Sequence, residues 1–72
     1  MPYVNVRLTG DKVSAEKKLE IIRRMTEVLV DVLGKEPATT FIVIDEVDPE
    51  NWGIAGTSVA ERRAARRRGE AV

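Results

Sequence analysis

Residues 2–8 read Pro2-Tyr3-Val4-Asn5-Val6-Arg7-Leu8, and this stretch decides the fold because apolar and polar residues alternate along it. Val4, Val6 and Leu8 fall on one face of an extended chain, and the residues between them fall on the other. A period of two predicts a β-strand with one buried face. Pro2 takes the first position, where its missing N–H removes no hydrogen bond between strands, so it also serves to blunt the start of the strand.

A single long helix is predicted over residues 15–33. Ser14 is a suitable N-cap, and Gly34 provides the left-handed residue that commonly ends a helix. Apolar residues recur at spacings of three and four, namely Ile21, Ile22, Met25, Val28, Leu29, Val32 and Leu33. This apolar face is wider than two strands can cover. We therefore expect a neighbouring subunit against it, the alternative being a helix buried within the monomer.

The second strand is predicted over residues 40–46, where the apolar run from Phe41 to Ile44 indicates coverage on both faces. Strand, helix and strand of these lengths form a right-handed β-α-β unit with parallel strands. Residues 52–56 predict a short extended segment or a small hairpin, and residues 58–61 begin a short last helix. The expected fold class is α/β (α+β), a single β-α-β unit plus a C-terminal β-hairpin. We expect one domain over residues 1–63 and a mobile, arginine-rich tail over residues 64–72.

Size and composition point to an oligomer. The chain has 72 residues, no cysteine and no histidine, so disulfides and the usual metal ligand are missing, and we expect no metal and no cofactor. A chain this short buries only about 60 % of its unfolded surface. Oligomerisation is the remaining route to stability. With no signal peptide and no apolar run of about 18 residues, we expect a cytoplasmic protein without a membrane partner.

Pro2 also carries the chemical hypothesis. Removal of Met1, which the small proline side chain favours, would leave a secondary amine on a fixed ring. Apolar burial or nearby cations lower the pKa of such an amine, because they disfavour its charged form. A group whose pKa lies near the operating pH is an efficient general base. The sequence therefore predicts a proton-transfer site at Pro2.

Several features together resemble a known family: Met-Pro at the start, the alternating strand, one long helix, the second strand and Asn51-Trp52-Gly53-Ile54-Ala55-Gly56. From Pro2 to about Arg63 the chain resembles the 4-oxalocrotonate tautomerase family, and Asp45-Glu46-Val47-Asp48 resembles its DmpI-type branch. The resemblance implies a tautomerase/MIF-like fold and a homo-hexamer, a trimer of dimers with active sites at subunit boundaries. It also implies an isomerase that moves a proton between oxygen and carbon in a 2-hydroxy-dienoate or a similar small-molecule enol carboxylate.

The resemblance further implies roles for individual residues. Pro2 matches the catalytic proline. Trp52 matches an aromatic wall that keeps the pKa of the proline low, although tryptophan also serves as a core or interface anchor. Lys12 corresponds most nearly to a loop arginine that binds the substrate carboxylate, and it supplies the charge without the bidentate fork.

One cation of the family pattern is missing. The arginine expected at the start of the second strand falls on Thr40 or Phe41, so a dicarboxylate should bind poorly. Arg62, with Arg63 beside it, is the candidate substitute for substrate binding. Surface or inter-subunit ion pairs are the alternative role for both, as they are for Arg7, a further candidate on the first strand.

Two other functions stay open. A hydratase or dehalogenase acting on an unsaturated acid would use Pro2 as a general acid, with Asp45 or Glu46 orienting a water unless these carboxylates are structural. The other possibility is a non-catalytic oligomeric binding module that uses the tail, since residues 61–72 contain five arginines and two glutamates. The tail lacks aromatic residues for base stacking and the rest of the chain is net acidic, so we expect no nucleic-acid partner.

Overall fold

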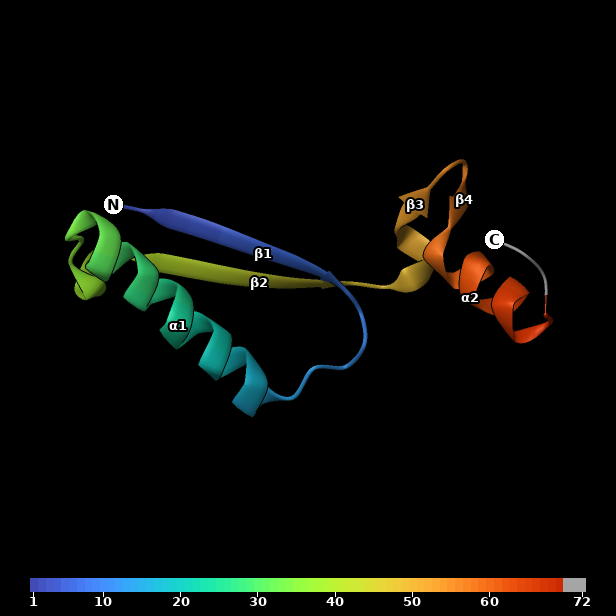
Figure 1. Cartoon of the computed structure of the whole chain (residues 1–72), viewed down its shortest axis with the longest axis horizontal. Helices are drawn as coiled ribbons and strands as arrows, with labels where there is room; N and C mark the ends of the chain where they lie inside the picture. The colour runs from blue at the N-terminus through green and yellow to red at the C-terminus, as the bar shows by residue number, and fades with distance from the viewer. Residues whose placement is uncertain (70–72) are drawn as a thin grey trace.

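The computed structural model describes residues 1–69 and shows a β-α-β unit followed by a hairpin and a second helix (Figure 1). Strands β1 (Tyr3–Thr9) and β2 (Phe41–Val47) are joined by helix α1 (Ala15–Leu33) and the 3-10 turn η1 (Pro37–Thr39). The strands pair in parallel, from Tyr3 opposite Phe41 to Thr9 opposite Val47. The predicted β-α-β unit with parallel strands is confirmed.

Local signals set the limits of α1, and the predicted range is confirmed. The Ser14 side chain accepts a hydrogen bond from the Lys17 N–H at 3.2 Å, which satisfies one of the free donors in the first turn. Gly34 has a φ of 66°, the left-handed conformation that ends a helix. Its N–H donates to the Val30 carbonyl at 2.9 Å.

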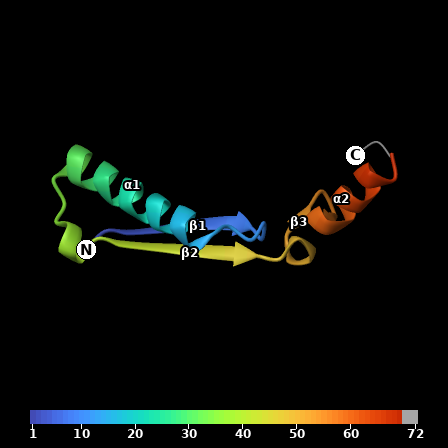
Figure 2. The same ribbon diagram turned by 90° about the horizontal axis from the view of Figure 1, so that it is seen from below.

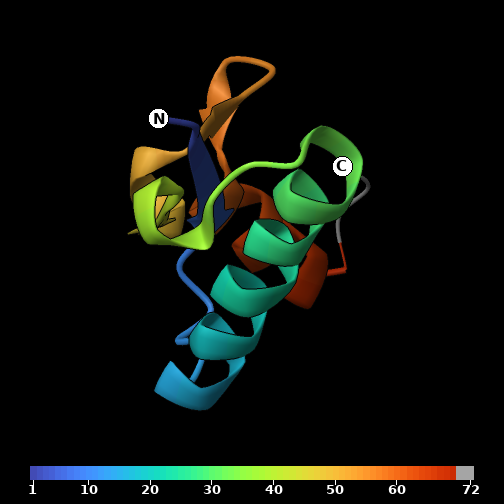
Figure 3. The same cartoon turned by 90° about the vertical axis from the view of Figure 1, so that its left-hand side faces the viewer.

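Helix α1 covers only one face of the strand pair, as Figure 2 shows, and in Figure 3 the helix lies to one side of β1. The half-buried strand residues on this face are Val4, Val6, Leu8, Ile42 and Ile44. We call the opposite face, which carries Tyr3, Asn5, Arg7, Phe41, Val43 and Asp45, the outer sheet face. Phe41 and Val43 are 46 % and 41 % exposed there. The expectation that β2 is covered on both faces is therefore wrong for the single chain, which has no second layer.

The C-terminal part forms the expected hairpin. After the 3-10 turn η2 (Pro49–Asn51), strands β3 (Gly53–Ile54) and β4 (Thr57–Ser58) pair antiparallel. Ala55 and Gly56 between them have φ values of 51° and 82°, and positive φ at both central positions is typical of a two-residue type I′ turn.

Helix α2 (Val59–Arg67) is longer than the sequence predicted. It continues past Ala64, where the mobile tail was expected to begin, and Ala65 is the one residue classed as buried in residues 1–69. The Ser58 side chain caps its start by accepting from the Glu61 N–H at 3.1 Å. Residues 70–72, the last part of the expected tail, lie outside the described residues.

The chain is elongated, with extents of 48 × 25 × 17 Å and a radius of gyration of 16.4 Å. A compact domain of this length would have a radius of about 11 Å. The accessible surface is 5453 Å², against about 4450 Å² for a compact monomer of this mass. On α1, Val28 and Val32 stay 53 % and 74 % exposed, as the wide apolar face led us to expect. The chain therefore leaves much of its apolar surface open to a partner.

In the part of the chain that the structure describes, neither helix is long and apolar enough to cross a membrane. The cytoplasmic location stays a prediction.

Candidate active site

Pro2 lies directly before β1 and is half-buried. Its carbonyl oxygen accepts a hydrogen bond from the Phe41 N–H at 2.9 Å, which fastens it to the start of β2. The strand ladder continues from this bond, so the pyrrolidine ring is held at one end of the sheet. While Met1 is attached, the Pro2 nitrogen is an amide and has no useful basicity. Removal of Met1 would place a secondary amine at this fixed position.

Lys12 lies in the loop between β1 and α1, at the opposite end of the sheet. Its φ of 54° is in the left-handed region, which lysine seldom occupies. The backbone holds the loop on both sides of this residue. The Gly10 N–H donates to the Val47 carbonyl at 2.6 Å, and the Val13 N–H donates to a Glu46 carboxylate oxygen at 3.2 Å. Two hydrogen bonds donated to β2 thus hold the loop on both sides of Lys12.

Two ion pairs strengthen these anchors. Glu46 pairs with Lys18 of α1, and the hydrogen bond from Lys18, followed by that from the Val13 N–H, lowers the pKa of the Glu46 carboxyl below its ordinary value. On the other side of Lys12, Asp11 pairs with Arg63 of α2 at 2.9 Å. The loop that carries Lys12 is therefore tied to α1, β2 and α2.

Trp52 and Arg62 both belong to the C-terminal part of the chain, Trp52 just before β3 and Arg62 in α2. The Trp52 carbonyl accepts a hydrogen bond from the Val59 N–H at 2.9 Å, which joins the residue before β3 to the first turn of α2. Arg62, on the next turn, is half-buried, and no acidic side chain of residues 1–69 pairs with it. It lines an open pocket of about 280 Å³ whose other walls are Ile54, Val59, Arg63 and Arg66.

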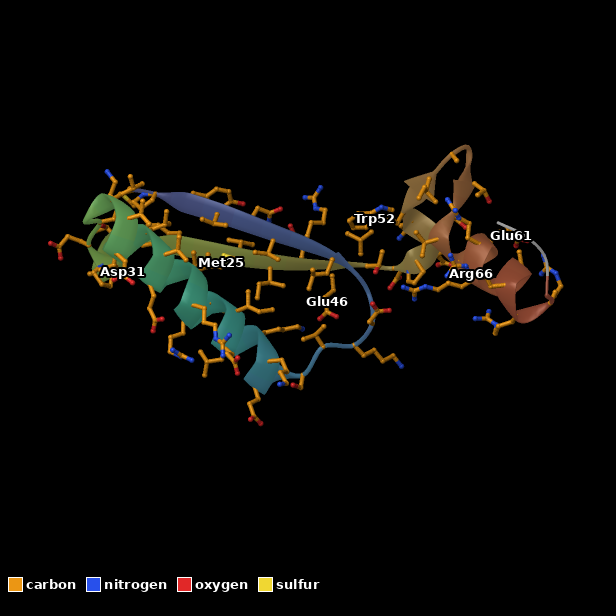
Figure 4. The ribbon with its side chains drawn as sticks, in the orientation of Figure 1. Met25, Asp31, Glu46, Trp52, Glu61 and Arg66 are labelled. Atoms are coloured by element: carbon orange, nitrogen blue, oxygen red, sulfur yellow. The ribbon has the colours of Figure 1, made fainter. Side chains whose placement is uncertain are left out.

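A single chain does not bring the candidate residues into one site. A seven-residue strand such as β1 spans about 23 Å, and this separates Pro2 from Lys12. Figure 1 shows the N-terminus at one end of the long axis and α2 at the other. Figure 4 places Trp52 and Arg66 at the α2 end. Lys12, Trp52 and Arg62 therefore belong to the half of the chain away from Pro2.

The other candidates from the sequence already have partners. Arg7 pairs with Asp45 at 3.3 Å on the outer sheet face, and Asn5 donates to the same carboxylate oxygen at 2.8 Å. The hydrogen bond from Asn5, then that from Arg7, lowers the pKa of Asp45. Engaged carboxylates favour a structural role for Asp45, as they do for Glu46. Figure 4 shows Glu46 pointing from β2 toward the start of α1.

The structure adds one residue that the sequence reasoning had assigned to the tail. Arg66 follows Arg62 by four residues, so the two lie on one face of α2 and both line the pocket. The four-residue spacing of Arg62 and Arg66 is visible in the sequence. It indicates a shared helix face only because α2 extends to Arg67.

Residues 2–62 match the family of proteins described as tautomerase enzymes. The chain belongs to the tautomerase enzyme family. It is therefore an isomerase of the 4-oxalocrotonate tautomerase type, as the resemblance implied. A probable tautomerase, K2, of Dickeya dadantii is 59 % identical over 63 residues, which cover 88 % of this chain and 94 % of the relative. A 2-hydroxymuconate tautomerase of Pseudomonas putida is 36 % identical over 61 residues, covering 85 % and 95 %.

Solved structures of the tautomerase family share the fold. DmpI from Helicobacter pylori superposes with a TM-score of 0.77 at 34 % identity, covering 83 % of this chain and 98 % of that one. This structural similarity to DmpI agrees with the resemblance of residues 45–48 to the DmpI-type branch. A heterohexameric 4-oxalocrotonate tautomerase from Chloroflexus aurantiacus gives a TM-score of 0.75 at 26 % identity, covering 85 % and 97 %. The tautomerase/MIF-like fold class is confirmed.

Proposed function

We propose that this tautomerase catalyses keto–enol proton transfer on a 2-hydroxy-dienoate or a similar enol carboxylate, with Pro2 as the general base once Met1 is removed. The observation that carries the proposal is the bond from Phe41 to Pro2, which holds the pyrrolidine ring at the end of the sheet. The similarity to a 2-hydroxymuconate tautomerase supports the substrate class.

In this mechanism the Pro2 nitrogen takes the proton from the enol oxygen and returns it to a carbon of the same substrate. Negative charge spreads over the substrate during the transfer, and a cation placed near it lowers the barrier. Lys12 is the proposed carboxylate anchor, held in place by the loop bonds described above. Trp52 would wall the site and exclude water, which disfavours the charged form of Pro2 and lowers its pKa. Arg62 is the second proposed substrate-binding cation.

We also propose that the site forms between chains of a homo-hexamer, a trimer of dimers. The roughly 23 Å length of β1 separates Pro2 from Lys12 within one chain. The elongated shape and the exposed apolar surface support an assembly in which another subunit brings its C-terminal part to Pro2. The similarity to a heterohexameric relative supports the number of chains.

The first test combines intact-mass spectrometry with ketonisation assays on phenylenolpyruvate and 2-hydroxymuconate. We expect a protein that lacks Met1 and converts at least one of the two enols. Pro2→Ala should reduce kcat/KM by about 10²- to 10⁴-fold, the usual worth of a general base. Pro49→Ala, a proline removed from η2 instead, is the matched control and should stay active.

The pH profile separates a base from an acid at Pro2. A general base works in its unprotonated form, so kcat/KM should rise with pH and then level off. A hydratase or dehalogenase that uses Pro2 as an acid would lose activity over the same interval. A protein without Met1 that converts neither enol would contradict the proposed reaction.

A further inference from the structure

The C-terminal end of α1 carries negative charge that the chain itself does not balance. Asp31 lies in the last turn of the helix and Glu36 follows shortly after it, and the last turn contains no basic residue. A helix C-terminus is already the negative end of the helix dipole, where a cation is stabilising and a carboxylate is not. Lys35 is the one cation between the two acids in the sequence, and no basic side chain of residues 1–69 forms an ion pair with either acid. This end of the helix therefore favours a cation from outside the chain.

Apolar side chains accompany these carboxylates. Val32 and Leu33, the last two residues of α1, are 74 % and 60 % exposed. We call Asp31, Val32, Leu33 and Glu36 together the acidic end of α1. Figures 1 and 2 show the last turn of α1 at the same end of the long axis as the N-terminus, and Figure 4 labels Asp31 there. The acidic end of α1 thus lies at the Pro2 end of the chain.

The pocket on α2 has the complementary composition. Ile54 and Val59 supply its apolar walls, and Arg62, Arg63 and Arg66 supply its cationic walls. The pocket volume is about 280 Å³, compared with about 150 Å³ for the cavity that removal of one large aliphatic side chain leaves in a protein core. The pocket therefore has room for the apolar side chains of a helix end.

Arg66 is available for a carboxylate, whereas Arg63 is not. Arg63 is engaged by Asp11 at 2.9 Å. Arg66 is exposed, and no acidic side chain of the described residues pairs with it. A planar guanidinium can donate two parallel hydrogen bonds to one carboxylate. Arg62 lies one turn nearer the start of α2, so a carboxylate bound at Arg66 leaves Arg62 to its proposed role.

The two surfaces do not meet within one chain. Figure 4 shows Asp31 and Arg66 toward opposite ends of the long axis, which extends over 48 Å. A surface at one end of a molecule that fits a surface at its other end is satisfied by a second copy of the same molecule. Charge and apolar character therefore both point to contact between copies of this chain.

We propose that the pocket on α2 receives the acidic end of α1 from a second copy, with Arg66 paired to Asp31 of the partner subunit. The inference rests on the proposed function, because this contact would complete the proposed site. Val59 of the pocket donates its N–H to the Trp52 carbonyl at 2.9 Å. Helix α2 therefore carries Trp52 with it when it docks at the Pro2 end of another chain.

Charge reversal tests the contact. Light scattering over a dilution series is the readout, in the urea concentration that brings dissociation of the wild type into range. Arg66→Glu should raise the protein concentration at which half of the assembly dissociates by about 10-fold at low salt, because an exposed attraction becomes a repulsion. Asp31→Lys should have the same effect. Both substitutions in one chain should restore the wild-type value, because the two positions then attract each other again between copies.

Arg67→Glu is the matched control, because it makes the same charge change on the same helix outside the pocket lining. It should leave the dissociation concentration near the wild-type value. Arg67→Glu combined with Asp31→Lys has the same net charge as the first double variant and should dissociate as readily as Asp31→Lys alone. Arg66 and Asp31 are both exposed, so circular dichroism should show the wild-type helix content at high protein concentration.

Three results would overturn the proposed contact. The first is an Arg66→Glu protein that dissociates no more readily than Arg67→Glu. The second is a double variant of Arg66 and Asp31 that dissociates as readily as either single variant. The third is a wild-type protein that is monomeric at every concentration.

Ketonisation of phenylenolpyruvate by the wild type at high concentration reports the proposed function separately. An inactive protein whose assembly depends on Arg66 and Asp31 as expected would refute the reaction and keep the contact. An active protein whose assembly is indifferent to both residues would refute the contact and keep the reaction.

Discussion

Replacing Val43 with lysine should dissociate the proposed assembly. Val43 lies on the outer sheet face, opposite Asn5 of β1 and two residues before Asp45 in β2, and together with Tyr3 and Phe41 it forms the apolar half of that face. These three side chains are 41 %, 62 % and 46 % exposed in the single chain. A partner that covers this face would bury the new ammonium beside Asp45, whose carboxylate is already engaged by Arg7 and Asn5, at a cost on the order of several kcal/mol in each subunit.

The size of the effect follows from the dimensions of the chain. Six chains of 8.0 kDa give a mass of about 48 kDa. A compact assembly of that size has a radius of gyration of about 22 Å, whereas the isolated chain has one of 16.4 Å. The dissociated chain should also lose helix signal, because a chain with this little buried surface is marginal by itself.

Light scattering after gel filtration gives the mass, small-angle X-ray scattering gives the radius, and circular dichroism gives the helix content. Val43→Ile keeps the β-branched apolar side chain and serves as the matched control, with the wild-type mass and radius expected. A Val43→Lys protein that keeps the full mass and radius would show that this face is not an interface. A wild-type protein of about 8 kDa that stays folded would refute the assembly itself.

Three further predictions concern the loop and the helix end. Arg63→Asp should raise KM in the ketonisation assay by about 2- to 5-fold, because the exposed pair with Asp11 that holds the Lys12 loop is worth up to about 1 kcal/mol. Adding Asp11→Arg should restore the wild-type KM, and a KM that stays high in the double variant would disprove the pairing. Since the folded-state pKa of Glu46 is lowered, its stabilisation is present above the ordinary value of 4.5 and is lost as pH falls below it. Urea unfolding should therefore show a weaker acid dependence for Glu46→Gln than for the wild type, and parallel curves would contradict the assignment. Gly34→Ala should lower the free energy of unfolding by about 1 kcal/mol because alanine disfavours the left-handed backbone. A steric clash does not contribute, since no atom lies within 4 Å of the added Cβ. An unchanged unfolding midpoint would count against this reason.

The elements that the sequence predicted well carry their own local signals. Ser14 and Gly34 mark both ends of α1 by chemistry that acts within a few residues, and the alternation in β1 fixes which face meets the helix. The end of α2 has no such signal. Arginine and alanine are good helix formers, so the helix runs on until the turn at Gly69, and the sequence offered no reason to stop it at Ala64.

The candidate site could be predicted less completely, because its decisive contacts join residues far apart in the sequence. Asp11 and Arg63 are 52 positions apart, and no local sequence pattern near either residue indicates that they pair. The same holds for the Glu46 bond that fixes the loop of Lys12, which spans 33 positions. The resemblance supplied roles for Pro2, Lys12 and Trp52, whereas the availability of Arg62 and Arg66 depends on which arginines already have partners.

The division of the chain into two halves has a consequence for the proposed chemistry. Each chain carries both Pro2 and the Lys12, Trp52 and Arg62 group, yet β1 keeps the two sets apart by the length of a strand. A rigid parallel pair cannot fold back to join them, because its ladder would have to break. With the roles proposed for Pro2, Lys12 and Arg62, proton transfer and carboxylate binding come from different subunits of the proposed assembly, and we expect activity to fall with dissociation even when each of these residues is intact. Dilution of the active enzyme should therefore lower its specific activity in step with its mass, and activity that persists in a monomer would show that the site lies within one chain.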